Sequence, residues 1–123
     1  MASCSAAVPT DFHDKIRKAL GFKGLKYIHI HTPCPTGWGT EERLSVKLGK
    51  LAVETGLYVL FEIEDGEMKL SPPSARLLTK KKMPPVSDYL GPQSRFKTLP
   101  EAAVENLQQE VDAKWETYRS QMT

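Results

Sequence analysis

The residues best suited to chemistry lie close together, between positions 29 and 34. His29 and His31 are two apart in an apolar segment that predicts a strand, so their side chains share one face, and Cys34 follows in the next loop. Imidazole and thiolate groups bind zinc, but this spacing matches no zinc finger or ribbon, and zinc needs a fourth ligand such as Cys4 or His13. We therefore interpret both histidines as packed strand residues.

Cys34 lies in a segment whose composition restricts the backbone. Residues Thr32–Gly39 include two prolines and two glycines, which prevent regular structure. A rigid loop points a sulfur atom in one direction, as a metal ligand requires. A nucleophile needs a base and a lowered thiol pKa, and a histidine is the only nearby group that supplies them. We rank Cys34 as a metal ligand first, a structural thiol second and a nucleophile third.

Composition excludes several classes of function. The chain has 123 residues, of which 40% are hydrophobic and 26% charged, as in a soluble globular domain. A net charge of +2 gives no field suited to nucleic acid, and no apolar run approaches the roughly 18 residues of a membrane span. No phosphate-binding loop or secretory signal is evident. We predict a cytoplasmic protein with no nucleic-acid or membrane partner.

Hydrophobic periodicity predicts an α/β fold over residues 1–71. A helix after Thr10 has one apolar face, and Leu25–His31 is typical of an interior strand covered on both sides. A second helix begins at Thr40 and ends at Gly56, and Leu57–Ile63 predicts the next strand, followed by a hairpin turn at Asp65–Gly66. The expected apolar faces are Phe12, Ile16, Ala19 and Leu20 in the first helix and Leu44, Leu48, Leu51 and Ala52 in the second.

This order of elements predicts a βαβ unit in a mainly parallel sheet. Its right-handed crossover places the Cys34 loop at the carboxyl edge of the sheet, where α/β folds bind ligands. Residues 72–97 are rich in proline and lysine and predict an extended arm, and 98–123 predict an amphipathic C-terminal helix. The apolar stripe of that helix comprises Val104, Leu107, Val111, Trp115, Tyr118 and Met122.

Several segments, in order, resemble the β subunit of the 2-oxoacid:ferredoxin oxidoreductases, and above all pyruvate:ferredoxin oxidoreductase (pyruvate synthase). They are Tyr27–Gly39, Leu51–Tyr58, Phe61–Gly66, Pro85–Leu90 and Gln93–Lys97, and the Pro-Cys-Pro-Thr-Gly-Trp sequence at 33–38 is the most specific. The resemblance implies the C-terminal portion of a thiamin-diphosphate-binding fold. It also implies that Cys34 ligates a four-iron, four-sulfur (4Fe-4S) cluster.

The resemblance further implies an activity in anaerobic metabolism. Enzymes of this family decarboxylate a 2-oxoacid oxidatively on thiamin diphosphate with magnesium, form an acyl-coenzyme A, and pass electrons through 4Fe-4S clusters to ferredoxin. The expected partners are therefore the other subunits or domains, ferredoxin, coenzyme A and the 2-oxoacid, with pyruvate as the leading substrate. On this basis the chain is an enzyme component.

The sequence departs from the family in one important respect. The family's other cluster cysteines and its thiamin-diphosphate and magnesium motifs have no counterpart here, and a 4Fe-4S cluster needs four thiolates where this chain has two cysteines. We therefore expect a C-terminal part of a β subunit that is inactive and holds no cofactor alone, with Cys4 as a structural thiol. Strands missing from its sheet would leave an apolar edge exposed. The alternatives are a non-catalytic interaction module, a truncated family member and a small zinc protein.

Overall fold

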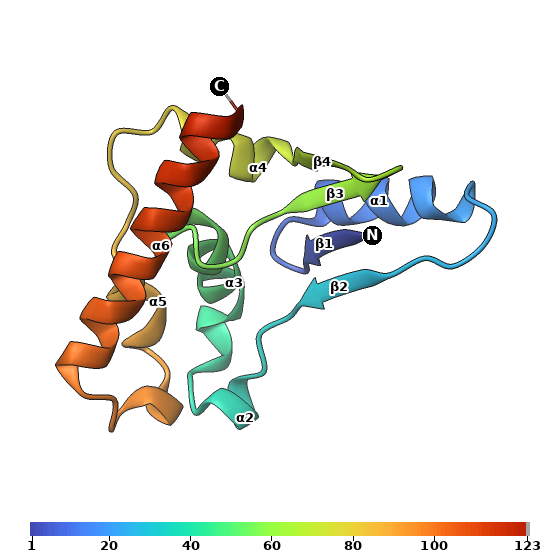
Figure 1. Cartoon of the computed structure of the whole chain (residues 1–123). Coiled ribbons are helices and arrows are strands. Elements are labelled where there is room, and N and C mark those ends of the chain that lie inside the picture. Colours follow the sequence, from blue (N-terminus) through green and yellow to red (C-terminus); the bar gives the residue numbers. More distant parts are fainter. Residues whose placement is uncertain (123) are drawn as a thin grey trace.

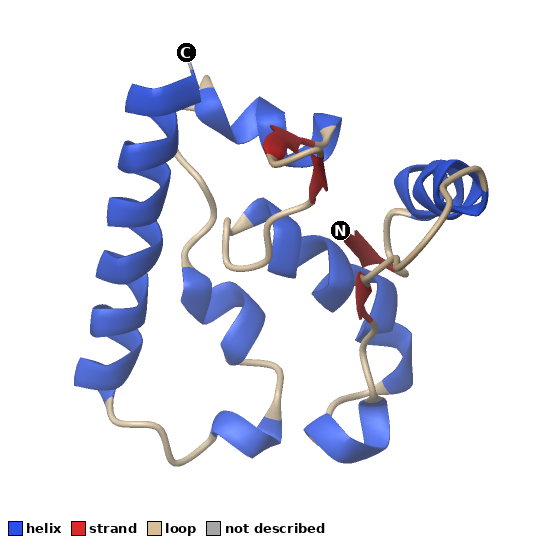
Figure 2. Ribbon diagram, turned by 45° about the vertical axis from the view of Figure 1, so that its right-hand side comes forward, coloured by secondary structure: helices blue, strands red, loops and turns tan. Residues whose placement is uncertain are grey.

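The computed structural model describes residues 1–122, and Thr123, the last residue of the predicted 98–123 helix, lies outside the described residues. Figures 1 and 2 show the sheet and α1 on one side of the molecule and the long α6 on the other, with α3 between them. No helix within residues 1–122 is long and apolar enough to cross a membrane. In chain order the elements are β1 (Ala2–Ser5), α1 (Pro9–Leu20), β2 (Ile28–His31), α2 (Pro35–Trp38), η1 (Glu42–Leu44), α3 (Ser45–Glu54), β3 (Phe61–Glu64), β4 (Glu67–Leu70), α4 (Pro72–Ala75), η2 (Arg76–Leu78), α5 (Val86–Leu90), η3 (Ser94–Phe96) and α6 (Glu101–Met122).

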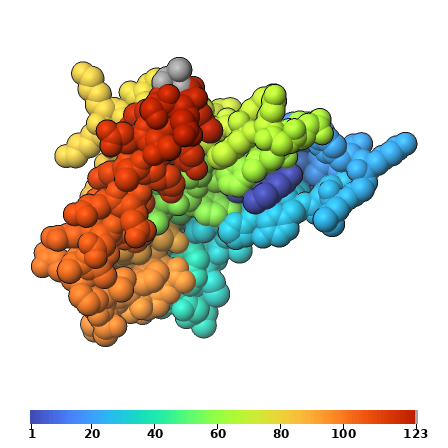
Figure 3. All heavy atoms as spheres, viewed as in Figure 1, coloured from blue at the N-terminus to red at the C-terminus, as the bar shows by residue number. Residues whose placement is uncertain are grey.

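The four strands form a mixed sheet in the order β2-β1-β3-β4. β1 is parallel to β2, with Ala2 opposite Ile28, and antiparallel to β3, where Ala2 lies opposite Glu62. In Figure 3 the dark-blue N-terminal residues accordingly lie between the cyan and green segments. β3 and β4 form the predicted hairpin, with Asp65 and Gly66 both in the left-handed region that a tight turn requires.

The predicted βαβ unit is wrong. Because β3 is antiparallel to β1, it is also antiparallel to β2, so the connection through α3 does not join parallel strands. The parallel unit is instead β1, α1 and β2. The sequence did not reveal β1 because Ala-Ser-Cys-Ser has little of the β-branched and aromatic character typical of strands. The predicted interior strand, β2, is therefore an edge strand among the described residues.

The α1 helix is confirmed, but its expected apolar face is not buried. The one buried side chain of α1 is Lys15, whose Nζ donates to the carbonyl oxygen of Ser3 at 2.7 Å and to Asp11 Oδ2 at 2.8 Å. These bonds satisfy the ammonium group within the protein. Ile16 and Leu20, by contrast, are exposed.

The hydrophobic core lies beside the sheet, between α3 and the C-terminal elements. Leu48, Leu51 and Ala52 of α3 are buried, as the sequence predicts. The helix begins at Ser45 and not at the predicted Thr40, and Leu44 lies in η1, where it is partly buried. Residues 72–97 form short helices rather than the expected extended arm, and they contribute Leu77, Val86, Tyr89 and Leu90 to the core. The yellow segment that projects in Figure 3 belongs to this part of the chain, where Lys80, Lys81 and Lys82 are exposed.

The C-terminal helix packs on this core through the predicted stripe. Val111 and Trp115 are buried, and Val104, Leu107 and Tyr118 are partly buried against them. Trp115 Nε1 donates to the carbonyl oxygen of Gly56 at 3.0 Å. Gly56 has a φ of 76°, and a Cβ at this position would collide with the Trp115 ring. A glycine is therefore needed at 56 for two independent reasons.

We predict that Gly56→Ala destabilises the chain by about 3 kcal/mol, because the substitution adds steric overlap to backbone strain. Gly24→Ala is the matched control, since Gly24 has a φ of 91° but nothing within 4 Å of its added Cβ. The Gly24→Ala control should lower the free energy of unfolding by about 1 kcal/mol. Denaturant unfolding of both variants measures the difference, and equal losses would show that the Trp115 contact is unimportant.

Candidate functional site

The Cys34 side chain is exposed at the point where β2 leads into α2. Cys34 is the N-cap residue of α2, and its carbonyl oxygen accepts a hydrogen bond from Trp38 N at 2.8 Å. A Cβ on Gly37 would lie 3.2 Å from the Cys34 sulfur, so the glycine leaves room for that sulfur. The thiol thus faces solvent from a backbone that is fixed on both sides of it.

The end of the Cys34 loop (residues 32–39) packs against η3. Gly39, with a φ of 61°, ends α2, and its carbonyl oxygen accepts a hydrogen bond from Ser94 N at 3.0 Å. A Cβ on Gly39 would overlap the Ser94 side chain. The guanidinium carbon of Arg95 lies 4.2 Å from the centroid of the Trp38 ring, a cation–π contact. Residues far along the chain therefore hold the loop in place.

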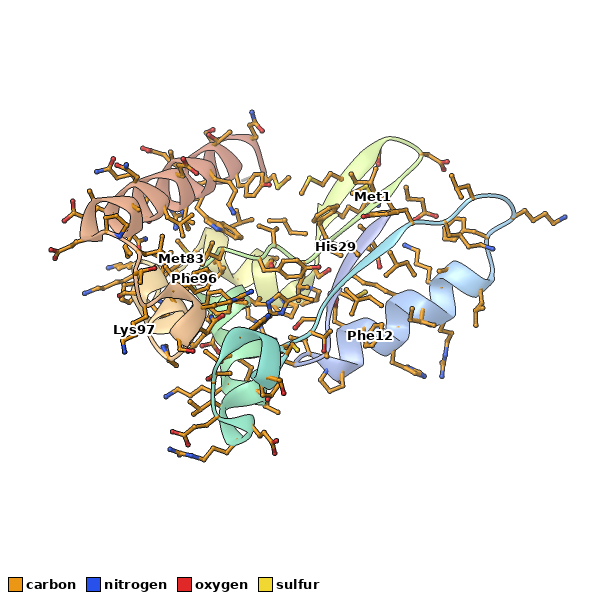
Figure 4. All side chains as sticks on the ribbon, turned by 90° about the horizontal axis from the view of Figure 1, so that it is seen from below. Met1, Phe12, His29, Met83, Phe96 and Lys97 are labelled. Carbon is orange, nitrogen blue, oxygen red and sulfur yellow. The ribbon has the colours of Figure 1, made fainter. Side chains whose placement is uncertain are left out.

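A cluster of aromatic rings joins β2 to the Cys34 loop and to α5. The His31 ring lies 5.0 Å from Tyr58 and 5.6 Å from Trp38, and its Nε2 is 3.1 Å from the Tyr89 hydroxyl. Tyr58 also donates a hydrogen bond to the carbonyl oxygen of His29 at 2.9 Å. His31 is thus a packed residue, as expected, but the same expectation for His29 was wrong, because His29 is exposed. Figure 4 shows His29 on the sheet side of the molecule, apart from Met83 and Phe96 of the C-terminal part.

The electrostatics of this cluster favour uncharged side chains. Burial, assisted by the positive Arg95 and by His29, lowers the pKa of His31, and its Nδ1 has no hydrogen-bond partner among the described residues. Burial also raises the pKa of Tyr58 to about 12 and raises that of Tyr89. The cluster is therefore neutral near pH 7 and acts as packing beside the loop.

The other candidate ligands do not join Cys34. Cys4 is fully buried in β1, and desolvation raises the pKa of its thiol, which disfavours the thiolate. His13 is exposed on α1, where it lies beside Asp14. Among residues 1–122, no three His, Cys, Asp or Glu side chains are grouped to hold a metal ion. The zinc alternative therefore lacks a ligand set among the described residues.

The amino-acid sequence is similar to curated proteins, although no family model matches the chain. Over 113 residues it is 43% identical to pyruvate synthase subunit PorB of Methanothermobacter marburgensis, and over 115 residues 37% identical to ketoisovalerate oxidoreductase subunit VorB of Pyrococcus furiosus. The chain is homologous to the PorB and VorB β subunits of the 2-oxoacid:ferredoxin oxidoreductases. The matches cover 92% and 94% of this chain but only 37% and 36% of those PorB and VorB subunits.

The comparison confirms the family resemblance, while the position of the chain within the subunit stays a prediction. PorB of Methanocaldococcus jannaschii is 38% identical over 114 residues, again 93% of this chain and 36% of the relative. The chain therefore spans little more than a third of the PorB and VorB subunits that it matches. The role of Cys34 is not decided by these identities.

Sequence reasoning about chemistry missed Tyr58, Tyr89 and Arg95. All three lie in segments that resemble the family, 51–58, 85–90 and 93–97, and this was the available signal. No local pattern connects those segments with β2 and the Cys34 loop, since every contact joins residues far apart in the sequence. The tertiary structure was needed to bring them together.

We predict that the two cysteines differ sharply in reactivity. Cys34 is exposed and Cys4 is fully buried, so an aromatic disulfide reagent should modify one thiol rapidly in the folded chain and the second only in denaturant. The absorbance of the released aromatic thiolate measures how many thiols react per chain. Cys34→Ser should abolish the rapid phase, and a rapid phase of two thiols in the native chain would contradict the observed burial of Cys4.

We also predict a pH dependence of stability that originates at His31. Because the folded-state pKa of His31 is lowered, the unfolded chain binds more protons than the folded chain as the pH falls below about 6.5. The free energy of unfolding should therefore fall between pH 7.5 and pH 5.5. In His31→Gln this part of the fall should disappear. Urea unfolding of both proteins at pH 7.5 and pH 5.5 measures this difference. An equal fall in the free energy of unfolding in the unaltered chain and in His31→Gln would show that His31 is not its source.

Proposed function

We propose that the chain is part of the β subunit of a 2-oxoacid:ferredoxin oxidoreductase and that Cys34 ligates one iron of a 4Fe-4S cluster. The supporting observation is the exposed Cys34 thiol at the start of α2, within the Pro-Cys-Pro-Thr-Gly-Trp loop. Such a cluster, when bound, transfers single electrons. The chain's own contribution is to present one sulfur in a fixed orientation, because hydrogen bonding and orientation around a ligand sulfur adjust the reduction potential.

The cluster's remaining ligands come, in this proposal, from polypeptide outside this chain. The other cysteine of the sequence is Cys4, and because it is buried in β1 its sulfur is not available to a site shared with another polypeptide. The residues for thiamin diphosphate and magnesium are likewise assigned elsewhere, since the family's motifs for both have no counterpart in this sequence. Catalysis therefore requires the other subunits or domains, together with coenzyme A and ferredoxin.

We propose pyruvate as the 2-oxoacid. Pyruvate synthase subunits account for the two matches at 43% identity, those from Methanothermobacter marburgensis and Methanothermobacter thermautotrophicus. The ketoisovalerate oxidoreductase subunits match at 36% to 38%, a range that three further pyruvate synthase subunits share. Comparison of pyruvate with 2-ketoisovalerate as substrates of the assembled enzyme tests this choice. A cytoplasmic location belongs to the same proposal.

The decisive experiment is anaerobic purification of the chain from its own cells through a tag at the C-terminus. The N-terminus is unsuitable for a tag, because the Met1 ammonium group donates to the carbonyl oxygen of Ile63 at 2.9 Å. We expect the larger subunits, iron and acid-labile sulfide to copurify. Cys34→Ser should reduce the iron and the cluster chromophore at least several-fold while leaving the copurifying polypeptides in place.

Cys4→Ala is the matched control for this experiment. It removes the other thiol at a buried site where alanine fits, so iron content should not change. Equal loss of iron in both variants would point to a general effect on folding. Recovery of the unaltered chain without iron would overturn the ligand role and favour a non-catalytic interaction module. Retention of the full chromophore in Cys34→Ser would also overturn the ligand role.

A further inference from the structure

Two expectations from the sequence fail at the same place in the structure. The pattern of Leu25–His31 indicates a strand covered on both sides, yet β2 lies at the edge of the described sheet, with Ile30 42% exposed. The apolar stripe of α1 indicates a buried face, yet Leu20 is 79% exposed. Both failures leave apolar side chains in solvent where the sequence indicates burial.

The outer edge of β2 carries unpaired backbone groups. The carbonyl oxygens of Tyr27 and His31 accept hydrogen bonds from Ala2 N and Ala6 N, so these alternate residues face β1. Successive residues in a strand direct their backbone groups to opposite edges, and Ile28 and Ile30 therefore face outward. An open edge of this kind is a template for another strand.

The exposed flank of α1 lies on the side of this open edge. Lys18 forms ion pairs with Glu62 and Glu64 of β3, at 2.6 and 2.9 Å, and this fixes the flank of α1 that faces β3. Residues in a helix are separated by about 100°, so Ile16 and Leu20 project from the opposite flank, toward the β2 side. Apolar side chains and unpaired backbone groups thus occur together.

We propose that the outer edge of β2 binds a β-strand from the part of the PorB-like or VorB-like subunit that this chain does not contain. The flank of α1 that carries Ile16 and Leu20 packs on the same polypeptide. The matched subunits are the source of this occupant, because the chain spans only 37% of PorB and the larger part of that fold must pack somewhere. The proposal rests on the family membership in the proposed function, but it does not depend on Cys34.

Exposed apolar residues elsewhere provide matched controls. Leu99 is 41% exposed, against 42% for Ile30, and Val46 is an exposed helical residue comparable to Leu20. Neither control residue belongs to α1 or β2. Replacement of Leu20 or Val46 by lysine should leave the stability of the lone chain nearly unchanged, since both side chains are mostly in solvent. Ile30→Lys and Leu99→Lys should alter that stability by equal amounts, since the exposed fractions of the two residues match.

The experiment titrates the isotopically labelled chain with the portion of Methanothermobacter marburgensis PorB that the match leaves out, produced as a separate polypeptide. We expect the amide hydrogens of Ile28 and Ile30 to exchange rapidly in the chain alone and at least tenfold more slowly in the complex. The amides of His29 and His31, on the β1 side, should change little. Ile30→Lys and Leu20→Lys should weaken binding at least tenfold, whereas Leu99→Lys and Val46→Lys should not.

The outcomes separate this proposal from the role of Cys34. Cys34→Ser should bind the PorB portion as tightly as the unaltered chain, so loss of iron with retained binding would affect only the cluster proposal. Binding without protection of Ile28 and Ile30 would overturn the β2 edge as the interface. Equal protection by self-association of the chain, without the PorB portion, would identify a second copy as the occupant and also overturn it, as would failure to bind.

Discussion

The packing of Trp115 against Gly56 is the contact on which the arrangement of the rest of the chain depends. The carbonyl oxygen of Gly56 accepts hydrogen bonds from Trp115 Nε1 and from Lys114 Nζ, so α6 is attached directly to the turn that follows α3. Two residues later Tyr58 extends to the ring of His31. A helix that contributes no candidate ligand therefore fixes the direction in which the chain leaves α3, and with it one side of the aromatic cluster.

The Cys34 loop is positioned by segments from three parts of the sequence. β2 leads into it, and Tyr58, from the turn after α3, packs on His31 just before the loop. Tyr89 and Arg95, from the segment before α6, contact Trp38 within it. These contacts hold the backbone around the exposed Cys34 thiol in one arrangement. The short helices of 72–97 therefore have a structural role at the site as well as in the core.

The sequence-based predictions were right where they depend on residues close together in the sequence, and wrong where they depend on contacts between distant segments. The α3 stripe, the Asp65–Gly66 hairpin and the C-terminal helix were confirmed, because each depends on residues a few positions apart. The predicted order and direction of the strands were wrong, because β1 has weak strand propensity and its pairing joins distant segments. The burial of Lys15 in place of Ile16 was equally unforeseen, since it depends on the Ser3 carbonyl oxygen.

The sequence by itself determined the candidate ligand, its rigid loop and the family to which these residues point. Proline and glycine act on the backbone locally, so the restricted backbone around Cys34 was evident from the sequence. The expectation that Thr32–Gly39 has no regular structure was wrong, because Pro35–Trp38 form the short helix α2, whose first position suits a proline. Only the tertiary structure decided that Cys4 is withdrawn into β1, that Tyr89 and Arg95 hold the loop, and that β2 has an open edge. The physical reason is that burial and sheet order depend on which distant segments meet, and no local pattern encodes that choice.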